Sequence, residues 1–320
     1  MNGRLDVLCV ADMCVDLLLH GNVRPRFQQV EQIIGGYDIE LGGSANIFAS
    51  QFVKLGGTAG VVGWVGQDAF GEFVRQTLRY LGVDDSRVHG HPRLKTGLGV
   101  ALTEPDDRAI LTYPGTIDGV EPADLDSGLL AACRHWHIAS YFLLNKLRNH
   151  WPGWLRACKE AGLSTSLDPN WDPEDRWDGI TDLLPMVDVF LPNEAEASAI
   201  AKETSVLRAG EKLSSYGPLV VIKRGREGAM AFRDGERWAA APDVSRCPST
   251  PVDAVGAGDN FDAGFLRAWL ERCQIPRCLS LACRCGVASL AAAGGIQGQL
   301  REPFQGSTRT TNADTAEDIS

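Results

Sequence analysis

The sequence predicts an α/β protein with a mostly parallel sheet that is covered by helices on both faces. Short apolar runs of strand length alternate with longer amphipathic segments through most of the chain, which is the pattern of such a sheet. The predicted strands are Leu5–Ala11, Ala59–Val65, His135–Ala139, Ser164–Leu167, Val187–Leu191 and Leu219–Lys223. The predicted helices between them are Ala45–Leu55, Ala69–Leu81, Trp151–Ala161 and Glu194–Ala201.

Two stretches interrupt this alternation. Arg24–Leu41 is polar and irregular, whereas Thr96–Thr103 and Arg108–Tyr113 have the pattern of two strands joined by Glu104–Asp107. The Pro-Asp-Asp in that connection favours a turn. We therefore expect a small β flap built from about residues 24–41 and 96–116. A lid over a ligand and a plain edge hairpin both fit this pattern.

The C-terminal third differs from the rest of the chain. Asp234-Gly235 predicts a hairpin between Ala229–Arg233 and Arg237–Ala241. A glycine-rich loop then leads into two predicted helices, Asp259–Arg272 and Arg277–Ala293. From Gly306 onward apolar periodicity is lost, so we expect one domain over residues 1–305 and a disordered tail over 306–320.

The overall composition narrows the class of protein. The chain has 320 residues, of which 44% are hydrophobic and 22% charged, as in an ordinary globular protein. Its net charge of −10 argues against nucleic acid as a partner. A run of about 18 uncharged apolar residues, which a membrane span requires, is missing. The first residues do not resemble a signal peptide, so we expect a cytoplasmic protein.

The segment from Gly256 to Asp259 predicts an anion-binding site. Its small residues leave the backbone accessible, and Phe261, Phe265 and Trp269 follow at intervals of four residues, so a helix starts here. A helix N-terminus presents free N–H groups and the positive end of the helix dipole to an anion. Asp259 could cap this helix, and it could also take a proton from an attacking hydroxyl group.

A second glycine-rich segment, Gly42–Asn46, also precedes a helix. Paired glycines allow a ligand to approach the backbone, although ordinary helix capping by Ser44 explains the same residues. Asp12 and Asp16 are four residues apart, so on one extended segment they would point the same way. Ligands bind at the carboxyl ends of strands in open α/β sheets, and two carboxylates suit a polyhydroxyl compound.

Other phosphate-binding motifs are absent from the sequence. A Walker A loop requires a Gly-Lys pair, which the chain lacks. The dinucleotide fingerprint would need glycine at position 261, where Phe261 stands. The His-Arg-Asp triplet of protein kinases is missing as well.

Taken together, the motifs resemble those of the PfkB/ribokinase family of carbohydrate kinases. The resemblance extends over roughly residues 5–300 with order and spacing preserved. The segments that carry it are Gly42–Asn46, Gly63–Gly71, Asn193–Glu196, Val220–Gly228 and Asp253–Asp259. It implies a ribokinase-like, doubly wound sheet with a small β lid, and ATP-dependent phosphorylation of a hydroxyl group on a sugar or sugar acid.

The resemblance also implies roles for individual residues. Asp259 would be the general base, and the γ-phosphate would lie against Gly256, Ala257 and Gly258. The acceptor would be held by Asp16, Gly42, Gly43 and Asn46, with Asp12 adjacent. Lys223, Gly225 and Gly228 would border the nucleotide, and Asn193 and Glu196 would organise Mg²⁺ mostly through water. Asp253 occupies a place where family members often bind a monovalent cation, so a K⁺ requirement is left open.

Some positions depart from the family pattern. Ser44 stands where kinases of sugar phosphates tend to carry lysine, which favours an acceptor without a phosphate. Trp171-Asp172 stands where many members carry arginine, so a phosphate contact there is not expected. An adenosine-type nucleoside kinase and a non-catalytic sugar- or nucleotide-binding protein remain alternatives, with a NAD-dependent enzyme further off. Exposed lid edges would suit a homodimer.

Overall fold

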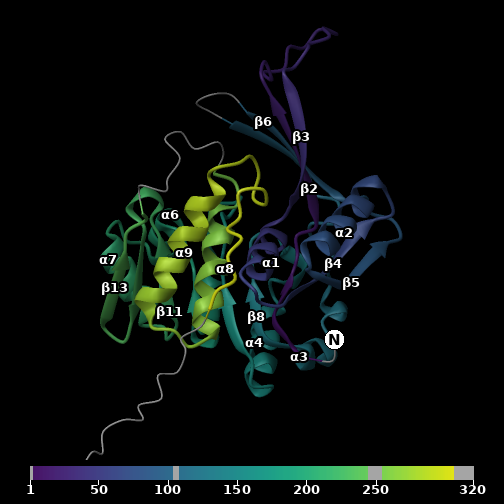
Figure 1. Ribbon diagram of the computed structural model, residues 1–320. Helices are drawn as coiled ribbons and strands as arrows, with labels where there is room; N and C mark the ends of the chain where they lie inside the picture. Colours follow the sequence, from purple (N-terminus) through teal and green to yellow (C-terminus); the bar gives the residue numbers. More distant parts are fainter. Residues whose placement is uncertain (1–2, 104–107, 244–253, 306–320) are drawn as a thin grey trace, which may run out of the picture.

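The computed structural model describes residues 3–103, 108–243 and 254–305, which form a large sheet flanked by helices and a second, smaller sheet (Figure 1). The large sheet has the strand order β13-β12-β11-β10-β9-β8-β1-β4-β5. Its strands are β1 (Leu5–Val10), β4 (Ala59–Gly66), β5 (Asp84–His91), β8 (Cys133–Ile138), β9 (Ser164–Leu167), β10 (Val189–Phe190), β11 (Leu219–Lys223), β12 (Ala229–Arg233) and β13 (Glu236–Ala240).

Neighbouring strands from β5 to β11 are parallel, and β12 and β13 add an antiparallel edge. Parallel strands place all their carboxyl ends at one border of the sheet, where ligands bind in this class of fold. The prediction of a mostly parallel α/β sheet is therefore confirmed.

Helices cover both faces of the sheet, and each face has its own apolar core. One face carries α1 (Ser44–Lys54), α2 (Ala69–Leu81), α8 (Ala257–Leu270) and α9 (Ile275–Ser289). The other carries α3 (Ser127–Ala132), α4 (Trp151–Glu160), α5 (Ile180–Leu183), α6 (Glu194–Ala201) and α7 (Val206–Ser214). Four short 3₁₀ turns lie in the connections of the described chain: η1 (Pro122–Asp124), η2 (Asn145–Leu147), η3 (Leu184–Met186) and η4 (Gly225–Glu227).

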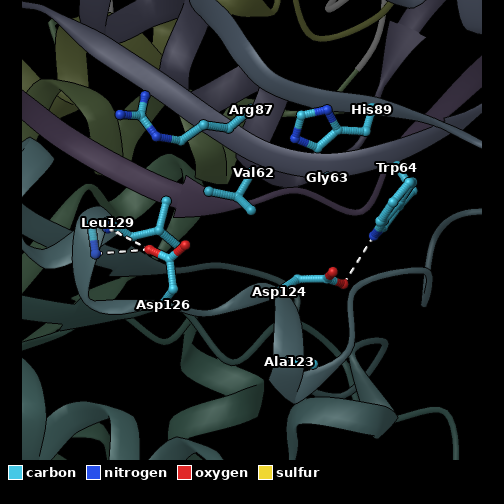
Figure 2. A pocket seen from close by; sticks show the side chains of 10 residues that line it. Val62, Gly63, Trp64, Arg87, His89, Ala123, Asp124, Asp126 and Leu129 are labelled. Atoms are coloured by element: carbon cyan, nitrogen blue, oxygen red, sulfur yellow. Dashed lines mark hydrogen bonds between the residues drawn. The ribbon is translucent and has the colours of Figure 1, made fainter.

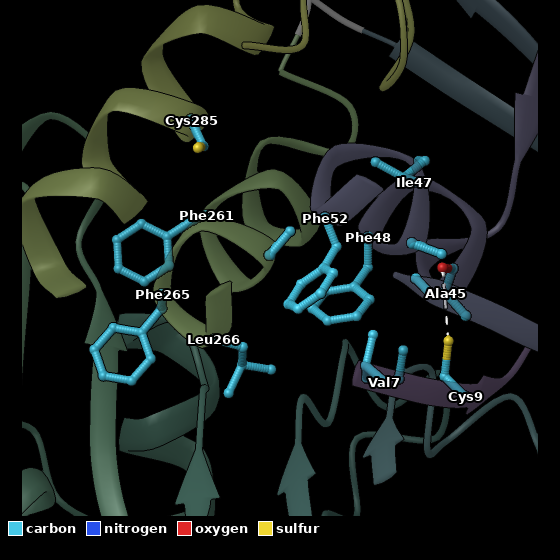
Figure 3. Close-up of a cluster of buried hydrophobic side chains, with 14 of the residues drawn as sticks. Val7, Cys9, Ala45, Ile47, Phe48, Phe52, Phe261, Phe265, Leu266 and Cys285 are labelled. Atoms are coloured by element: carbon cyan, nitrogen blue, oxygen red, sulfur yellow. Dashed lines mark hydrogen bonds between the residues drawn. The ribbon is translucent and has the colours of Figure 1, made fainter. Parts of the chain in front are cut away.

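Packing between α1 and α8 brings the two glycine-rich segments together. Phe48 and Phe52 on α1 belong to the same buried cluster as Phe261 and Phe265 on α8 (Figure 3). Fully burying side chains of this size stabilises a fold by roughly 1.5–3 kcal/mol each. Because both helices begin at the carboxyl border of the sheet, their glycine-rich N-terminal loops meet there.

The smaller sheet is the predicted β lid. It has the strand order β3-β2-β6-β7, in which β6 (Gly97–Thr103) and β7 (Arg108–Tyr113) are close to the predicted pair. Two strands of this sheet were not predicted, namely β2 (Cys14–His20) and β3 (Gly36–Gly42), and neither was β5 of the large sheet. The strand β3 lies in Arg24–Leu41 except for its last residue, and we expected that segment to be irregular. The turn at Glu104–Asp107 lies outside the described residues.

The register of the lid separates an apolar face from a polar one. Ile39, Leu17, Val100 and Leu111 are paired in one row across the four strands, and paired residues share a face. Successive residues alternate, so Asp16 and Glu40 lie on the opposite face. That polar face carries the carboxylate that the sequence assigns to the acceptor.

Other differences concern helix limits. The helix α2 has the predicted limits, whereas α8 begins at Ala257, two residues before the predicted start. The helix α9 ends at Ser289 rather than Ala293, and α3, α5 and α7 were not predicted. The single domain over 1–305 stays a prediction, and residues 306–320, expected to be disordered, lie outside the described residues.

Candidate active site

The N-terminus of α8 has the geometry of an anion-binding loop. Gly256 is the N-cap with φ 70°, and a Cβ there would lie 2.8 Å from Cα of Gly295. Only glycine fits this position without strain. Asp259 is therefore not the N-cap, as one interpretation of the sequence had it, but lies within the first helical turn. The first backbone N–H groups of a helix lack partners within it, which suits an anion. In this helix the N–H of Ala257 donates to the carbonyl oxygen of Ala254 at 3.3 Å.

These residues open onto a polar cavity of ≈ 300 Å³. The sequence-predicted residues that line it are Asn193, Glu196, Lys223, Gly225, Gly256, Gly258 and Asp259, joined by Asp168, Asn170 and Trp171. They come from the ends of different strands and from the N-termini of α6 and α8. The structure thus brings the predicted base, anion loop and magnesium-side residues into one place.

Asp259 lies in an environment that favours its protonated form. Burial raises the pKa of Asp259 well above its ordinary value, and the neighbouring carboxylate of Asp168 adds to the rise. The ammonium of Lys223 and a hydrogen bond with Ser44 oppose the rise. A carboxylate with a raised pKa is a stronger base than an ordinary aspartate.

Asp12 contacts the loop before α1 and fixes its conformation. A side chain at Gly43, which has φ 89°, would collide with the carbonyl oxygen of Asp12. The carboxylate of Asp12 accepts hydrogen bonds from the backbone N–H of Ser44 at 3.1 Å and from Oγ of Ser140 at 2.9 Å. Asp12 is buried, and burial raises its pKa while these hydrogen bonds oppose the rise. Its contacts are those of a residue that shapes the loop.

Asp16 occupies a different position from Asp12. The strand β1 ends at Val10 and β2 begins at Cys14, so the two acids are not on one extended segment, and that expectation was wrong. Asp16 lies on β2, and its carboxylate lies close to Gly99 and Gly42 of the neighbouring strands. A Cβ added to Gly99 would be 2.5 Å from one carboxylate oxygen, and a Cβ added to Gly42 would be 2.8 Å from the other. The two glycines therefore leave the space that this carboxylate occupies.

Asn46 is fully buried beneath the same loop. Its Nδ2 donates to the carbonyl oxygen of Gly42 at 2.9 Å, and its Oδ1 has no hydrogen-bond partner in the described structure. Asn46 therefore fixes the backbone of the paired glycines from below.

Asn193 and Glu196 form the capping box of α6. Oδ1 of Asn193 accepts from the N–H of Glu196 at 2.9 Å, and Oε2 of Glu196 accepts from the N–H of Asn193 at 2.8 Å. Burial raises the pKa of Glu196 to about 7, with Asp168 contributing to the rise. No cluster of three or more metal-binding side chains occurs among residues 3–103, 108–243 and 254–305. These residues fit Mg²⁺ that arrives with nucleotide phosphates and keeps most of its waters.

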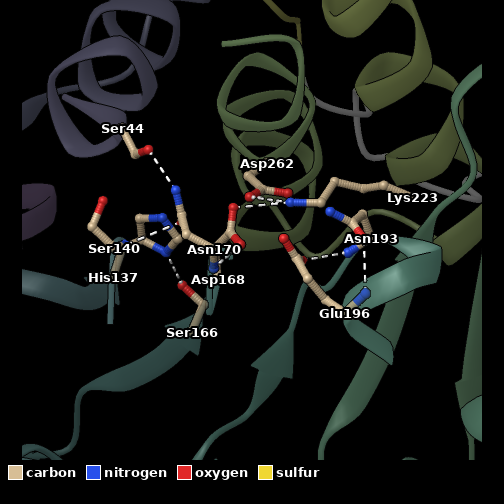
Figure 4. A network of polar contacts seen from close by, with 10 residues as sticks. All are labelled: Ser44, His137, Ser140, Ser166, Asp168, Asn170, Asn193, Glu196, Lys223 and Asp262. Atoms are coloured by element: carbon tan, nitrogen blue, oxygen red, sulfur yellow. Dashed lines mark hydrogen bonds and ion pairs between the residues drawn. The ribbon is translucent and has the colours of Figure 1, made fainter. Parts of the chain in front are cut away.

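Lys223 joins two carboxylates at the floor of the cavity (Figure 4). Its Nζ is 2.9 Å from Oδ2 of Asp168 and 3.1 Å from Oδ2 of Asp262. Burial would raise the pKa of Asp168, but Lys223 reverses this effect and holds the pKa below its ordinary value. Asp168 is therefore a fixed negative charge in the site.

A second cavity of ≈ 370 Å³ adjoins the first through Lys223, Gly225 and Gly258. Its walls are mainly apolar and include Gly228, Phe261, Cys283, Val287 and Leu290. A side chain at Gly228, which has φ 82°, would collide with the carbonyl oxygen of Ala240. Apolar walls with a polar mouth suit a flat heterocycle attached to a charged chain.

Sequence reasoning missed several residues of this network, namely Ser140, Asp168, Asn170 and Asp262. Ser140 and Asn170 have φ values of 54° and 56°, and the N–H of Ser140 donates to Oδ1 of Asn170 at 3.2 Å. Non-glycine residues in this conformation concentrate at functional sites. For Ser140, Asp168 and Asn170 the available signal was position, because they follow the carboxyl ends of two predicted strands; Asp262 lies within α8 and had no such signal.

A cavity elsewhere in the fold contains none of the predicted site residues. It lies at β4 and β5 and is lined by Trp64, Arg87 and His89 (Figure 2). Its acids already have partners, since Asp124 accepts from Nε1 of Trp64 at 2.9 Å and Asp126 accepts from the start of α3.

Asp253, the predicted monovalent-cation residue, lies outside the described residues. Within the ranges that the structure describes, no helix combines the length and the apolar character needed to cross a lipid bilayer.

An α/β fold with a glycine-lined anion loop, a buried aspartate and a β lid over one border of the sheet defines a phosphotransferase. The model of the pfkB family of carbohydrate kinases matches residues 5–301. A fructokinase from Klebsiella pneumoniae is 31% identical over 318 residues, which cover 92% of this chain and 96% of that protein. The chain belongs to the pfkB family of carbohydrate kinases and is an ATP-dependent enzyme of that family.

Other relatives differ in substrate. An ATP-dependent ribose-1-phosphate kinase from Halopiger xanaduensis is 29% identical, with 79% of this chain and 81% of that protein covered. Among solved structures, a ribokinase from Arabidopsis thaliana complexed with ribose and ATP has a TM-score of 0.78 at 21% identity, and 93% of this chain and 96% of that chain are covered. An adenosine kinase from Sinorhizobium meliloti has a TM-score of 0.79 at 21% identity, with 95% and 97% covered. These structures share the ribokinase-like fold.

Proposed function

We propose that the chain transfers the γ-phosphoryl group of ATP to a hydroxyl group of a neutral sugar or sugar acid, with Asp259 as general base. One observation carries this proposal: the first turn of α8, whose backbone N–H groups lack partners within the helix, lines the same cavity as the buried carboxylate of Asp259. Phosphoryl transfer needs positioning, stabilisation of charge and one group that takes the proton of the acceptor.

In this proposal the acceptor lies between the lid and α8. Asp16 accepts hydrogen bonds from its hydroxyl groups, and Gly42, Gly43 and Asn46 shape the loop on which it rests. The attacking hydroxyl gives its proton to Asp259 as its oxygen bonds to the γ-phosphorus. The bond between that phosphorus and the β,γ-bridging oxygen breaks, and ADP leaves. Backbone N–H groups of Gly256, Ala257 and Gly258 stabilise the charge on the transferring group.

The nucleotide extends along the two adjoining cavities. Its base would lie in the apolar cavity beside Gly228, and its phosphates would pass Gly225 and Lys223 toward α8. Mg²⁺, when bound, would neutralise charge on the phosphates, and Asn193 and Glu196 are placed to orient it through water. Relatives whose names or complexes include ATP support this part of the proposal. A monovalent cation at Asp253 stays a prediction.

An acceptor without a phosphate group is favoured by the charge around the site. Asp16 is an acid on the acceptor side of the site, whereas Ser44 provides a neutral hydroxyl that receives a hydrogen bond from Asn170. A phosphate monoester carries roughly −1.5 to −2 charges at neutral pH, so it would be repelled here.

The test is ADP release with Mg-ATP and a panel of hexoses, pentoses, sugar acids, nucleosides and sugar phosphates. We expect the highest kcat/KM with a neutral sugar or a sugar acid. A clear preference for a nucleoside or a sugar phosphate would overturn the acceptor class. Failure to bind ATP would overturn the proposal as a whole.

We also propose that the lid pairs with the lid of a second copy to form a homodimer. Its apolar face is exposed toward the tip, where Tyr37, Ile39 and Leu111 are 65%, 39% and 61% exposed. Toward the base of the same face Val15 and Leu41 are buried. An apolar sheet face of this kind is typical of an interface between proteins.

A further inference from the structure

Lys223 bridges the sheet to the helix that forms the anion site. It is the last residue of β11, and its N–H donates to the carbonyl oxygen of Pro192 at 2.9 Å, beside Asn193. Its Nζ contacts Asp168, which follows β9, and Asp262, which lies three residues after Asp259 on α8 (Figure 4). The side chain of Asp262 is only 1% exposed. The ammonium group is therefore fixed from two sides.

The ammonium group also reaches the anion site. An ammonium has three N–H donors, and within the described residues two carboxylate oxygens accept from it. A Cβ built on Gly258 would lie 3.5 Å from Nζ, so this atom lies against the first turn of α8. Lys223 lines both cavities. The remaining donor is thus at the junction that a phosphate chain would cross.

Charge in this cluster favours a cationic Lys223 beside a neutral Asp262. Burial alone would lower the pKa of Lys223, but the neighbouring carboxylates, Asp168 most of all, outweigh burial and raise it. Burial raises the pKa of Asp262 well above its ordinary value, and Asp168 adds to the rise although Lys223 opposes it. A protonated Asp262 would hold the ammonium by a hydrogen bond while leaving its charge available.

We propose that Lys223 donates a hydrogen bond to the phosphoryl group during its transfer, and that Asp262 is a positioning residue that holds Nζ against the first turn of α8. The proposal rests on the phosphotransferase function proposed above and adds a residue to its machinery. A donor held rigidly in a cavity is in place before charge develops, so it stabilises the transition state without reorganisation. Asp262 acts through Lys223 and has no contact with substrate in this arrangement.

Single substitutions test the donor Nζ of Lys223 and the acceptor of Asp262 separately. Lys223→Met should lower kcat roughly 100- to 1000-fold, the usual loss on removing one such donor, with little change in the KM of the acceptor. Asp262→Asn keeps an acceptor for Nζ, so its kcat should stay close to that of the wild type. Asp262→Leu removes the acceptor and should lower kcat at least about tenfold.

A binding measurement tests Lys223 independently of turnover. Calorimetry compares the affinity for the β,γ-methylene analogue of ATP with the affinity for ADP, both with Mg²⁺. The wild type should prefer the analogue, and Lys223→Met should reduce this preference about tenfold, which corresponds to one lost charge-assisted hydrogen bond. If the wild type releases no ADP with any acceptor, the proposed function fails, while the affinity ratio still decides the role of Lys223.

A merely structural role for this cluster predicts a different outcome. In Lys223→Met/Asp262→Leu two apolar groups replace the contact between Lys223 and Asp262, while Asp168 keeps its charge, so the melting temperature should recover only in part relative to Lys223→Met alone. If Lys223 serves phosphoryl transfer, kcat and the affinity ratio remain low in this double variant. Wild-type turnover or a wild-type affinity ratio in the double variant would overturn the proposal. The matched control is Arg267→Leu/Glu271→Gln, which removes another ion pair of α8, between groups 2.8 Å apart. This control should keep the wild-type kcat and the wild-type affinity ratio.

Discussion

Nδ2 of Asn170 donates a hydrogen bond to Oγ of Ser44 at 2.8 Å, and this contact joins the segment after β9 to the first turn of α1. Because Asn170 supplies a proton to the oxygen of Ser44, the hydroxyl proton of Ser44 is directed elsewhere. Burial raises the pKa of Asp259, and the hydrogen bond with Ser44 opposes that rise. Two residues outside the anion loop therefore tune the proposed general base.

Ser44→Ala should shift the pH dependence of the reaction. Without the hydroxyl group the pKa of Asp259 rises, and the base is active in its ionised form, so the acid limb of kcat/KM moves to higher pH. At pH values below the limb, Ser44→Ala should be less active than the wild type, and at high pH its activity should recover. A pH–rate profile from pH 5 to 9 measures the shift. Ser44→Thr keeps a hydroxyl group and should keep the limb in place; an unmoved limb in Ser44→Ala would show that Ser44 does not tune Asp259.

Buried histidines should make part of the stability depend on pH. Nδ1 of His137 and Nε2 of His135 both bond Oγ of Ser166, at 2.8 and 2.7 Å, and the ring of His137 stacks on Phe48. Burial lowers the pKa of His137 to about 3, so the folded protein keeps it neutral. The unfolded chain takes up this proton below its ordinary pKa of about 6.5. His137 therefore costs stability as the pH falls from about 6.5 toward 3.

His137→Gln should remove this pH-dependent contribution. The free energy of unfolding of the variant, compared with that of the wild type, should improve by about 1.4 kcal/mol for each pH unit between about 6 and 4. Carboxyl groups with raised pKa values make the free energy of unfolding change with pH in the opposite direction. They are present in both proteins, so their contribution cancels when the variant is compared with the wild type. Urea unfolding at several pH values measures it. His89→Gln changes an exposed histidine and should give no comparable trend; a constant difference for His137→Gln would contradict the prediction.

Gly256→Ala should damage both stability and turnover. Its φ of 70° costs an L-residue roughly 1–2 kcal/mol, and the added Cβ would also meet Gly295 and Ile47. Thermal melting and ADP release measure the two effects. Gly235→Ala is the matched control, because Gly235 has φ 80° with open space around it. Equal losses of stability in both variants would show that the contact with Gly295 is unimportant.

Charged residues on the apolar lid face should prevent the proposed dimer. Ile39→Lys/Leu111→Lys places charges at the two outer strands of one register row. Sedimentation should show a dimer for the wild type and a monomer for the variant. His20→Lys changes the opposite face and should leave the dimer intact. A wild-type monomer at micromolar concentration would contradict the proposed association.

The parallel sheet was predictable because its strands are apolar on both faces and its helices are amphipathic. The segment Ala69–Leu81 shows this well, since Asp68 caps its start and Gly82 follows its end in the left-handed conformation. The strand β2 was not predictable in the same way. Its Leu17, Leu18 and Leu19 lack alternation, because Leu18, which lies on the face opposite to Leu17 and Leu19, is apolar and buried as well.

The anion loop was predictable because its residues are contiguous, but the network around Lys223 was not. Lys223 is 55 residues from Asp168 and 39 from Asp262 in sequence, and only the packing of α8 on the sheet brings them together. The left-handed backbone of Asn170 likewise has no local signal. Sequence reasoning therefore found the groups on helix N-termini and missed those that meet across elements.

The most direct test of the proposed function is the rate of ADP release by Asp259→Asn with Mg-ATP and the best acceptor of the wild type. Asparagine has nearly the same size as aspartate but accepts no proton, so melting temperature and ATP affinity should be kept while kcat falls roughly 100-fold or more. Retention of near wild-type turnover by this variant would contradict the assignment of Asp259 as the general base.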